Sequence, residues 1–228
     1  MTKAITDQEL EHLLNFVGYG ELDAEVWFLG MEEAGGGENN IRSRLKFRTI
    51  EDCAEAHKIL GITKHHSGKK IIQRTWRGMC YIMLRLEGMG VDTESIRNYQ
   101  ADSLGRFQGK SLLCELLPIP KPSINDWQYE NLIPQYASRD EYYRTVKPRR
   151  VKYLQKMVYD HRPKAVVGYG KKYWEDYQEL FPNSKFSKCG QFLVARDTDL
   201  VVVLTDHLTA RTMNGKLDEV VSIINSRT

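Results

Sequence analysis

Two apolar runs, each followed at once by a polar loop, constrain the fold of this chain more than any other feature. Residues 26–29 lead into a loop at 30–37 that carries two acids and four glycines, and residues 200–204 lead into a loop at 206–211 that carries a histidine. In open α/β sheets, sites form in loops just beyond the carboxyl ends of buried strands. The two loops therefore predict one functional site, and we expect an enzyme.

The remaining pattern predicts an α/β fold. Strands are predicted at residues 25–29, 111–117, 165–169, 191–195 and 200–204, with helical periodicity between them. Four to five strands interleaved with helices predict a three-layer α/β/α sandwich around a central, mainly parallel sheet. We expect a single domain over residues 1–228, because this length is typical of one domain and no internal repeat divides it.

A proline leaves one helix open to two interpretations. Residues 140–159 have a helical pattern that contains Pro148. Proline lacks the backbone N–H that a helix interior needs, but it is well suited to a first helical turn. Pro148 is therefore expected either to break this helix or to start a second one.

Cysteine usage and the first residues indicate the compartment. The amino terminus has a polar, acidic first helix in place of an apolar signal segment, and no stretch approaches the roughly 20 apolar residues of a membrane span. The cysteines stand singly, without a Cys-x-x-Cys pair, at Cys53, Cys80, Cys114 and Cys189. We expect a cytoplasmic protein with no membrane contact.

The same spacings argue against a cofactor. The cysteine separations give no zinc or iron–sulfur signature. Four of the histidines away from the two loops also lack metal-ligand spacing, namely His57, His65, His66 and His161. We expect no metal and no cofactor, and the pair His65-His66 is interpreted as part of a basic loop that contacts phosphate.

The net charge of +3 is only mildly basic, but the basic residues are unevenly distributed. One cluster comprises Arg42, Arg44, Lys46 and Arg48, and another comprises Lys147, Arg149, Arg150 and Lys152. Such clusters suit a polyanion such as DNA. A solvated helix face is the simpler interpretation of either cluster alone.

The order of these pieces resembles the uracil-DNA glycosylase superfamily over residues 26–211. In that family a first strand ends in a Gly-x-Asp/Asn-Pro-Tyr/Gly loop, a later strand carries a base-reading Asn, and a last strand ends in His-Pro-Ser. The resemblance implies an enzyme that flips a base out of double-stranded DNA and hydrolyses its bond to deoxyribose. It implies no cofactor and no obligate protein partner.

Glu32 and His207 are the catalytic residues that the resemblance implies. Glu32 occupies the position of the acid that orients the attacking water, with Glu33 as the alternative. A carboxylate there stabilises the positive charge that builds on the sugar and directs water at the sugar carbon. His207 would bond to the base carbonyl and stabilise the departing base. Helix capping by the acids and a structural hydrogen bond of the histidine are the alternatives.

The first loop differs from the family in a way that bears on substrate. Ala34 replaces a Tyr that blocks groups on pyrimidine carbon 5, and Gly35, Gly36 and Gly37 follow it. We expect this part of the loop, together with Met31, to contact the substrate and to leave space for a bulky 5-substituent. A flexible glycine linker is the alternative interpretation.

Two further residues are expected to contact the base. Glu115 replaces the base-reading Asn, and a carboxylate that accepts from an exocyclic amine is how Glu reads cytosine. Its alternative is a salt bridge inside the fold. Phe47 is the candidate ring that stacks on the extruded base, unless an amphipathic helix buries it.

The DNA contacts are expected at the second loop and the first basic cluster. Arg211 is the candidate wedge that fills the gap left by the flipped base, with Thr209 beside it, while Arg42 and Arg44 would contact the backbone. The sequence thus predicts a monofunctional glycosylase for a cytosine with a large 5-substituent. Glucosylated hydroxymethylcytosine of phage DNA is the foremost candidate. The alternatives are a uracil or deaminated-base repair glycosylase and a non-catalytic DNA- or nucleotide-binding relative.

Overall fold

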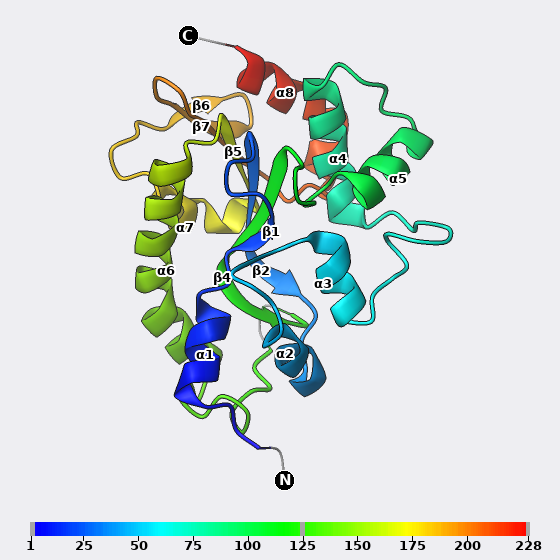
Figure 1. The fold of residues 1–228 in the computed structure, drawn as a ribbon. Coiled ribbons are helices and arrows are strands. Elements are labelled where there is room, and N and C mark those ends of the chain that lie inside the picture. Colours follow the sequence, from blue (N-terminus) through cyan, green and yellow to red (C-terminus); the bar gives the residue numbers. More distant parts are fainter. Residues whose placement is uncertain (1–2, 124–125, 227–228) are drawn as a thin grey trace.

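The computed structural model describes residues 3–123 and 126–226, which form an α/β fold around one mixed sheet (Figure 1). The sheet has eight strands in the order β3-β1-β4-β2-β5-β8-β7-β6. The strands are β1 (Gly18–Gly20), β2 (Val26–Ala34), β3 (Ile50–Glu51), β4 (Ser111–Lys121), β5 (Ala165–Tyr169), β6 (Ser187–Cys189), β7 (Phe192–Arg196) and β8 (Val201–Thr205).

The sheet is larger and more mixed than the four to five mainly parallel strands that the sequence predicts. Its centre, β4-β2-β5-β8, is parallel, but β1 runs antiparallel to β4, and β7 runs antiparallel to both β8 and β6. The additional strands β1, β3 and β6 have three residues or fewer. Segments this short carry too little hydrophobic alternation to be recognised.

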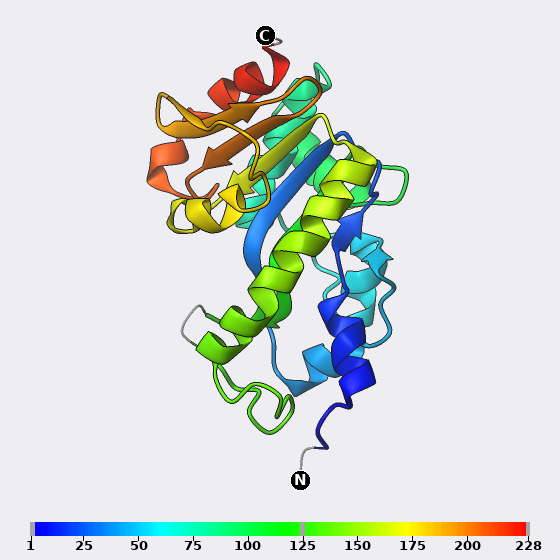
Figure 2. The ribbon, with the colours of Figure 1, turned by 90° about the vertical axis from the view of Figure 1, so that its left-hand side faces the viewer.

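Helices cover both faces of the sheet, as the two views in Figures 1 and 2 show. Side chains of β2 alternate between two cores: Trp27 and Leu29 pack with α1, α6 and α7, while Val26 and Phe28 pack with α3, α4, α5 and α8. The helices are α1 (Asp7–Leu14), α2 (Glu38–Arg44), α3 (Cys53–Ile59), α4 (Arg74–Leu86), α5 (Thr93–Asp102), α6 (Arg139–His161), α7 (Trp174–Gln178) and α8 (Leu217–Asn225). Within the described residues, no helix is long and apolar enough to cross a membrane.

Pro148 neither breaks a helix nor starts one, because α6 runs through it as a single helix of 23 residues. Pro148 is exposed, while Val146 and Val151 on either side of it are buried. The buried face of α6 packs along β4 and holds the helix in place despite the missing N–H. Tertiary packing thus overrides the local preference.

Candidate functional site

A cleft of about 460 Å³ opens at the carboxyl ends of the central parallel strands. Glu32 near the end of β2, Glu115 of β4, Tyr169 at the end of β5 and His207 just after β8 all line it. The parallel register of β4, β2, β5 and β8 brings these distant residues to one edge of the sheet. The structure therefore brings three of the sequence-predicted residues, Glu32, Glu115 and His207, to a single cleft.

Glu32 is held by two basic side chains. Its Oε2 lies 2.9 Å from Lys121 Nζ and 3.6 Å from Arg139 Nη2, and its other oxygen, Oε1, is buried with no hydrogen-bond partner among the residues that the structure describes. Burial lowers the pKa of Lys121 below its ordinary value, and the ion pair with Glu32 opposes that shift. A carboxylate fixed by one oxygen, with the second oxygen unpaired, can accept a hydrogen bond from a water molecule.

Glu33 also lines the cleft, but its carboxylate is paired with a buried arginine. Its Oε2 accepts a hydrogen bond from Tyr19 Oη at 2.8 Å and pairs with Arg44 Nη2 at 2.8 Å. Burial by itself would lower the pKa of the Arg44 guanidinium, but Glu33 raises it above the ordinary value overall. The geometry thus gives the two acids different roles: Glu33 balances a buried arginine, and Glu32 presents an unpaired oxygen.

Glu115 is a buried acid without a basic partner in the hydrogen bonds that it makes. Tyr169 Oη donates to its Oε1 at 2.9 Å, whereas its Oε2 is buried and finds no hydrogen-bond partner within the described part of the chain. Burial raises the pKa of Glu115 to about 8. A side chain on residue 30 would collide with it, because a Cβ there would lie 2.1 Å from Glu115 Oε2, and Gly30 leaves the necessary space. At neutral pH this carboxyl is largely protonated, and it both donates and accepts.

Because the pKa of Glu115 is raised, we expect the free energy of unfolding to depend on pH, and Glu115→Gln should remove that dependence. Between pH 4.5, the ordinary value, and about 8, the unfolded chain has lost this proton while the folded protein retains it. The free energy of unfolding therefore falls as the pH rises through that window. The free energy of unfolding is measured by urea denaturation at pH 5 and pH 9 for both proteins. From pH 5 to pH 9, the free energy of unfolding of Glu115→Gln should rise relative to that of the unmodified protein by more than about 1 kcal/mol.

An exposed acid serves as the control for that comparison. Glu130 lies on the surface, so Glu130→Gln should change the free energy of unfolding by the same amount at pH 5 and at pH 9. If the difference between Glu115→Gln and the unmodified protein is the same at pH 5 and pH 9, Glu115 does not carry a raised pKa in the folded state.

His207 stands at the rim of the cleft with its tautomer set by the following turn. The backbone N–H of Thr209 donates to His207 Nδ1 at 3.3 Å, and Thr209 Oγ1 lies 2.7 Å from the same nitrogen. Because Nδ1 accepts, the proton of the neutral ring is on Nε2. Partial burial lowers the pKa of His207 below its ordinary value, which favours that neutral form. Thr209 also contacts the histidine ring, and because it is exposed its contact with DNA stays a prediction.

The residues after Glu33 divide between the cleft and the turn into α2. Ala34 is exposed and lines the cleft with Gly35. Gly36 has a φ of +121°, and a Cβ there would lie 2.4 Å from Tyr129 Oη. Gly36 therefore serves close packing and does not line the cleft. Met31 is largely buried but borders an adjoining cavity of about 230 Å³ that also contains Glu32 and His207.

Phe47 does not line the cleft and cannot stack on a base there without a rearrangement. It is buried in the core, with its ring 5.6 Å from that of Phe16 and 6.4 Å from that of Tyr19. The alternative interpretation, burial in the core, is therefore correct. Phe16 and Tyr19 line the cleft in its place.

Many of the side chains in the two basic clusters form ion pairs or hydrogen bonds within the protein. Arg44 is buried against Glu33, and Arg42 pairs with Glu38 at 2.8 Å. Arg44 is thus not available to DNA, and Arg42 is only partly exposed. In the second cluster, Arg150 is buried. Arg211 is exposed at the start of a short 3-10 helix, four residues after His207, and does not itself line the cleft.

Sequence reasoning missed the residues that hold the acids in place. Tyr169 donates to Glu115, and its ring contacts that of His207 edge-on with 5.7 Å between centroids. Its position at the end of a parallel strand, directly before Gly170, was an available signal. Lys121 and Arg139 gave no such signal, because their contact with Glu32 depends on the course of β4 and α6.

Comparison with known proteins adds no assignment. No protein-family model matches the chain, and a search of curated proteins finds no significant match. The functional argument therefore rests on the residues of the cleft.

Proposed function

We propose that this protein is a monofunctional DNA glycosylase of the uracil-DNA glycosylase type, acting on a cytosine with a bulky 5-substituent. The observation that carries the proposal is the grouping of Glu32, Glu115 and His207 in one cleft at the carboxyl ends of parallel strands. The reaction hydrolyses the bond from deoxyribose to the base and leaves an abasic site in DNA. Glucosylated hydroxymethylcytosine is the proposed substrate, and defence against phage is the proposed role in the cytoplasm.

Each polar group has a task in this chemistry. Glu32, fixed by Lys121 through Oε2, would orient water through Oε1 and stabilise positive charge on the sugar. His207, protonated on Nε2 in its neutral form, would donate to the departing base as negative charge develops there. Neither task requires a metal or an organic cofactor.

The protonated state of Glu115 bears on which base is read. A neutral carboxyl can donate to cytosine N3 and accept from the exocyclic amine, a pairing that an ionised carboxylate cannot complete. The same neutral group can also satisfy the ring N–H and carbonyl of uracil. This is the specific observation that keeps a uracil or deaminated-base repair glycosylase as the second candidate.

The size of the cleft favours the modified base. Its volume of about 460 Å³ falls within the roughly 300–1,000 Å³ of sites for drug-sized ligands. Away from Glu32 the wall carries Gln73, Thr75 and Trp76 from the start of α4, together with Lys64. These polar and aromatic side chains suit a sugar attached to pyrimidine carbon 5.

The proposal is tested with duplex oligonucleotides that carry uracil, cytosine or glucosylated hydroxymethylcytosine. After incubation with the protein, hot alkali cleaves any abasic site, and the products are separated by length. We expect cleavage at the glucosylated base. Cleavage at uracil alone would establish the repair candidate, and no cleavage at any base would indicate a non-catalytic DNA- or nucleotide-binding protein.

A tyrosine at residue 34, where the resembling family has one that blocks groups on pyrimidine carbon 5, should narrow the range of substrates. Ala34→Tyr places a ring at an exposed strand end that lines the cleft, where Tyr is readily accommodated. We expect it to lower single-turnover release of the glucosylated base by about tenfold or more. Ala34→Ser, which keeps the space, should be nearly unchanged. Equal activity of the two variants on the glucosylated base would show that the substituent does not pass residue 34.

A further inference from the structure

Three potential metal ligands meet beside the cleft, on the side of α3. Cys53 is the first residue of α3, His57 lies one turn further along the same helix, and His66 comes from the segment that follows it. Their ligand atoms, one from each residue, all lie within 4.8 Å of one another. Residues four apart on a helix share one face, so the sequence alone puts Cys53 and His57 together.

We propose that Cys53, His57 and His66 bind a zinc ion or a similar divalent transition metal. Zinc bonds of about 2.0–2.1 Å to nitrogen and about 2.3 Å to sulfur put tetrahedral ligand atoms roughly 3.3–3.6 Å apart. His57 Nδ1 and His66 Nε2 are already 3.1 Å apart. Cys53 and His57 are buried, and His66 is half-buried. One thiolate and two imidazoles form a donor set that favours zinc over magnesium or calcium.

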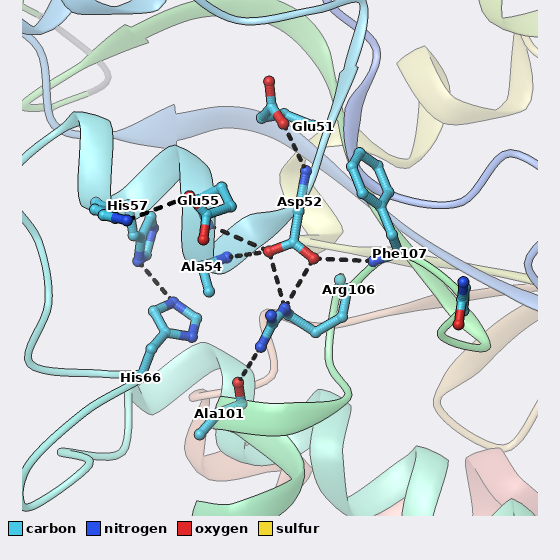
Figure 3. A network of polar contacts seen from close by, with 12 residues as sticks. Glu51, Asp52, Ala54, Glu55, His57, His66, Ala101, Arg106 and Phe107 are labelled. Atoms are coloured by element: carbon cyan, nitrogen blue, oxygen red, sulfur yellow. Dashed lines mark hydrogen bonds and ion pairs between the residues drawn. The ribbon is translucent and has the colours of Figure 1, made fainter.

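The surroundings hold the ligands in place without the metal (Figure 3). Asp52 caps α3 by accepting from the backbone N–H groups of Ala54 and Glu55 at 3.0 and 3.2 Å. Its carboxylate also binds Arg106 Nε at 2.8 and 2.9 Å, and Arg106 Nη1 donates to Ala101 O at 2.7 Å. The start of α3, which carries Cys53, is thereby tied to the end of α5. Such outer contacts orient metal ligands in known sites.

The metal would hold the segment that follows α3, with three protein ligands in place of the four of a closed structural zinc site. His66 belongs to the segment 60–73, which also supplies Lys64 and His65 to the wall of the cleft. A metal shared by His66 and the two α3 ligands would fasten this segment to the body of the protein. The fourth ligand would be water or a group that the bound state supplies, because three protein ligands leave one tetrahedral position open. The expectation of no metal overlooked the Cys-x-x-x-His spacing within a helix.

Metal content and cobalt substitution test the site directly. The full-length protein is stripped with a chelator and titrated with Co²⁺, and zinc in the protein as purified is measured by mass spectrometry. We expect one equivalent of zinc, and with Co²⁺ a thiolate-to-cobalt charge-transfer band that zinc abolishes. Zinc should also raise the melting temperature of the stripped protein. A protein that takes up no metal, or shows no thiolate band with Co²⁺, overturns the proposal.

Matched variants assign the ligands. Cys53→Ser should remove the charge-transfer band, and His66→Gln should weaken metal binding by at least about tenfold. His66 is half-buried, so this variant tests the site even if Cys53→Ser does not fold. The controls are Cys114→Ser, a buried thiol within the sheet, and His12→Gln, an exposed residue of α1. Metal binding that persists unchanged in His66→Gln would assign the metal to other residues and contradict the proposal.

Discussion

Glu32→Gln is expected to lower the rate of base release by about 10³-fold, because it removes the carboxylate charge beside the scissile bond. The substitution keeps the shape of the side chain but weakens its buried ion pair with Lys121, so we expect a lower free energy of unfolding, and release and DNA binding are compared on the folded variant. Single-turnover release from an oligonucleotide with the glucosylated base measures the rate. Fluorescence anisotropy of the same oligonucleotide measures binding.

Glu33→Gln is the matched comparison, one residue away. It weakens the pair with buried Arg44, so we expect a lower free energy of unfolding but base release from the folded protein within about tenfold of normal. The reverse outcome, with Glu32→Gln active and folded Glu33→Gln inactive, would make Glu33 the catalytic acid. If neither substitution affects release, the carboxylates of this loop do not carry out the chemistry.

Arg150→Leu is expected to destabilise the fold more than any other single change considered above. The buried guanidinium donates to three backbone carbonyls, those of Leu14, Glu115 and Leu116, at 3.1 to 3.2 Å. Burial lowers its pKa to about 10, so it remains charged at neutral pH. The leucine leaves those carbonyls without these donors, and we expect a loss of about 3 kcal/mol or more in urea denaturation.

Arg149→Leu is the control, because the neighbouring residue forms an exposed ion pair with Glu11. We expect it to change the free energy of unfolding by less than about 1 kcal/mol. Similar small losses for both variants would show that the carbonyls around Arg150 find other partners.

The central strands could be located from their apolar runs, but β2 and β4 continue to Ala34 and Lys121, so residues 30–34 and 118–121 are strand where a loop was predicted. The predicted strand at residues 165–169 matches β5, and those at 191–195 and 200–204 are each displaced by one residue from β7 and β8. The edge strands could not be predicted in this way. β1 is Gly-Tyr-Gly, and its pairing with β4 depends on residues almost a hundred positions away.

Some residues of the candidate site could likewise be predicted from the sequence, and others could not. Glu32 and His207 follow apolar runs and Glu115 lies within one, so their approach at one sheet edge could be anticipated. The base-stacking role of Phe47 was predicted only from its position along the chain, and the structure buries this side chain in the core. Arg44 and Arg150 resemble surface charges in the sequence, because only the folded chain supplies the acid and the carbonyls that compensate their burial.

The missing side chain at residue 30 links strand β2 to the choice of base. Even a methyl group there would come within 2.1 Å of Glu115 Oε2 and 2.4 Å of Tyr169 Oη. With alanine at residue 30, the polar ends of Glu115 and Tyr169 would both have to shift, whereas a shorter side chain at residue 115 would remove its part of the conflict. Under the proposed function, the base that residue 115 contacts would thus be coupled to the side chain that the neighbouring strand can carry at residue 30.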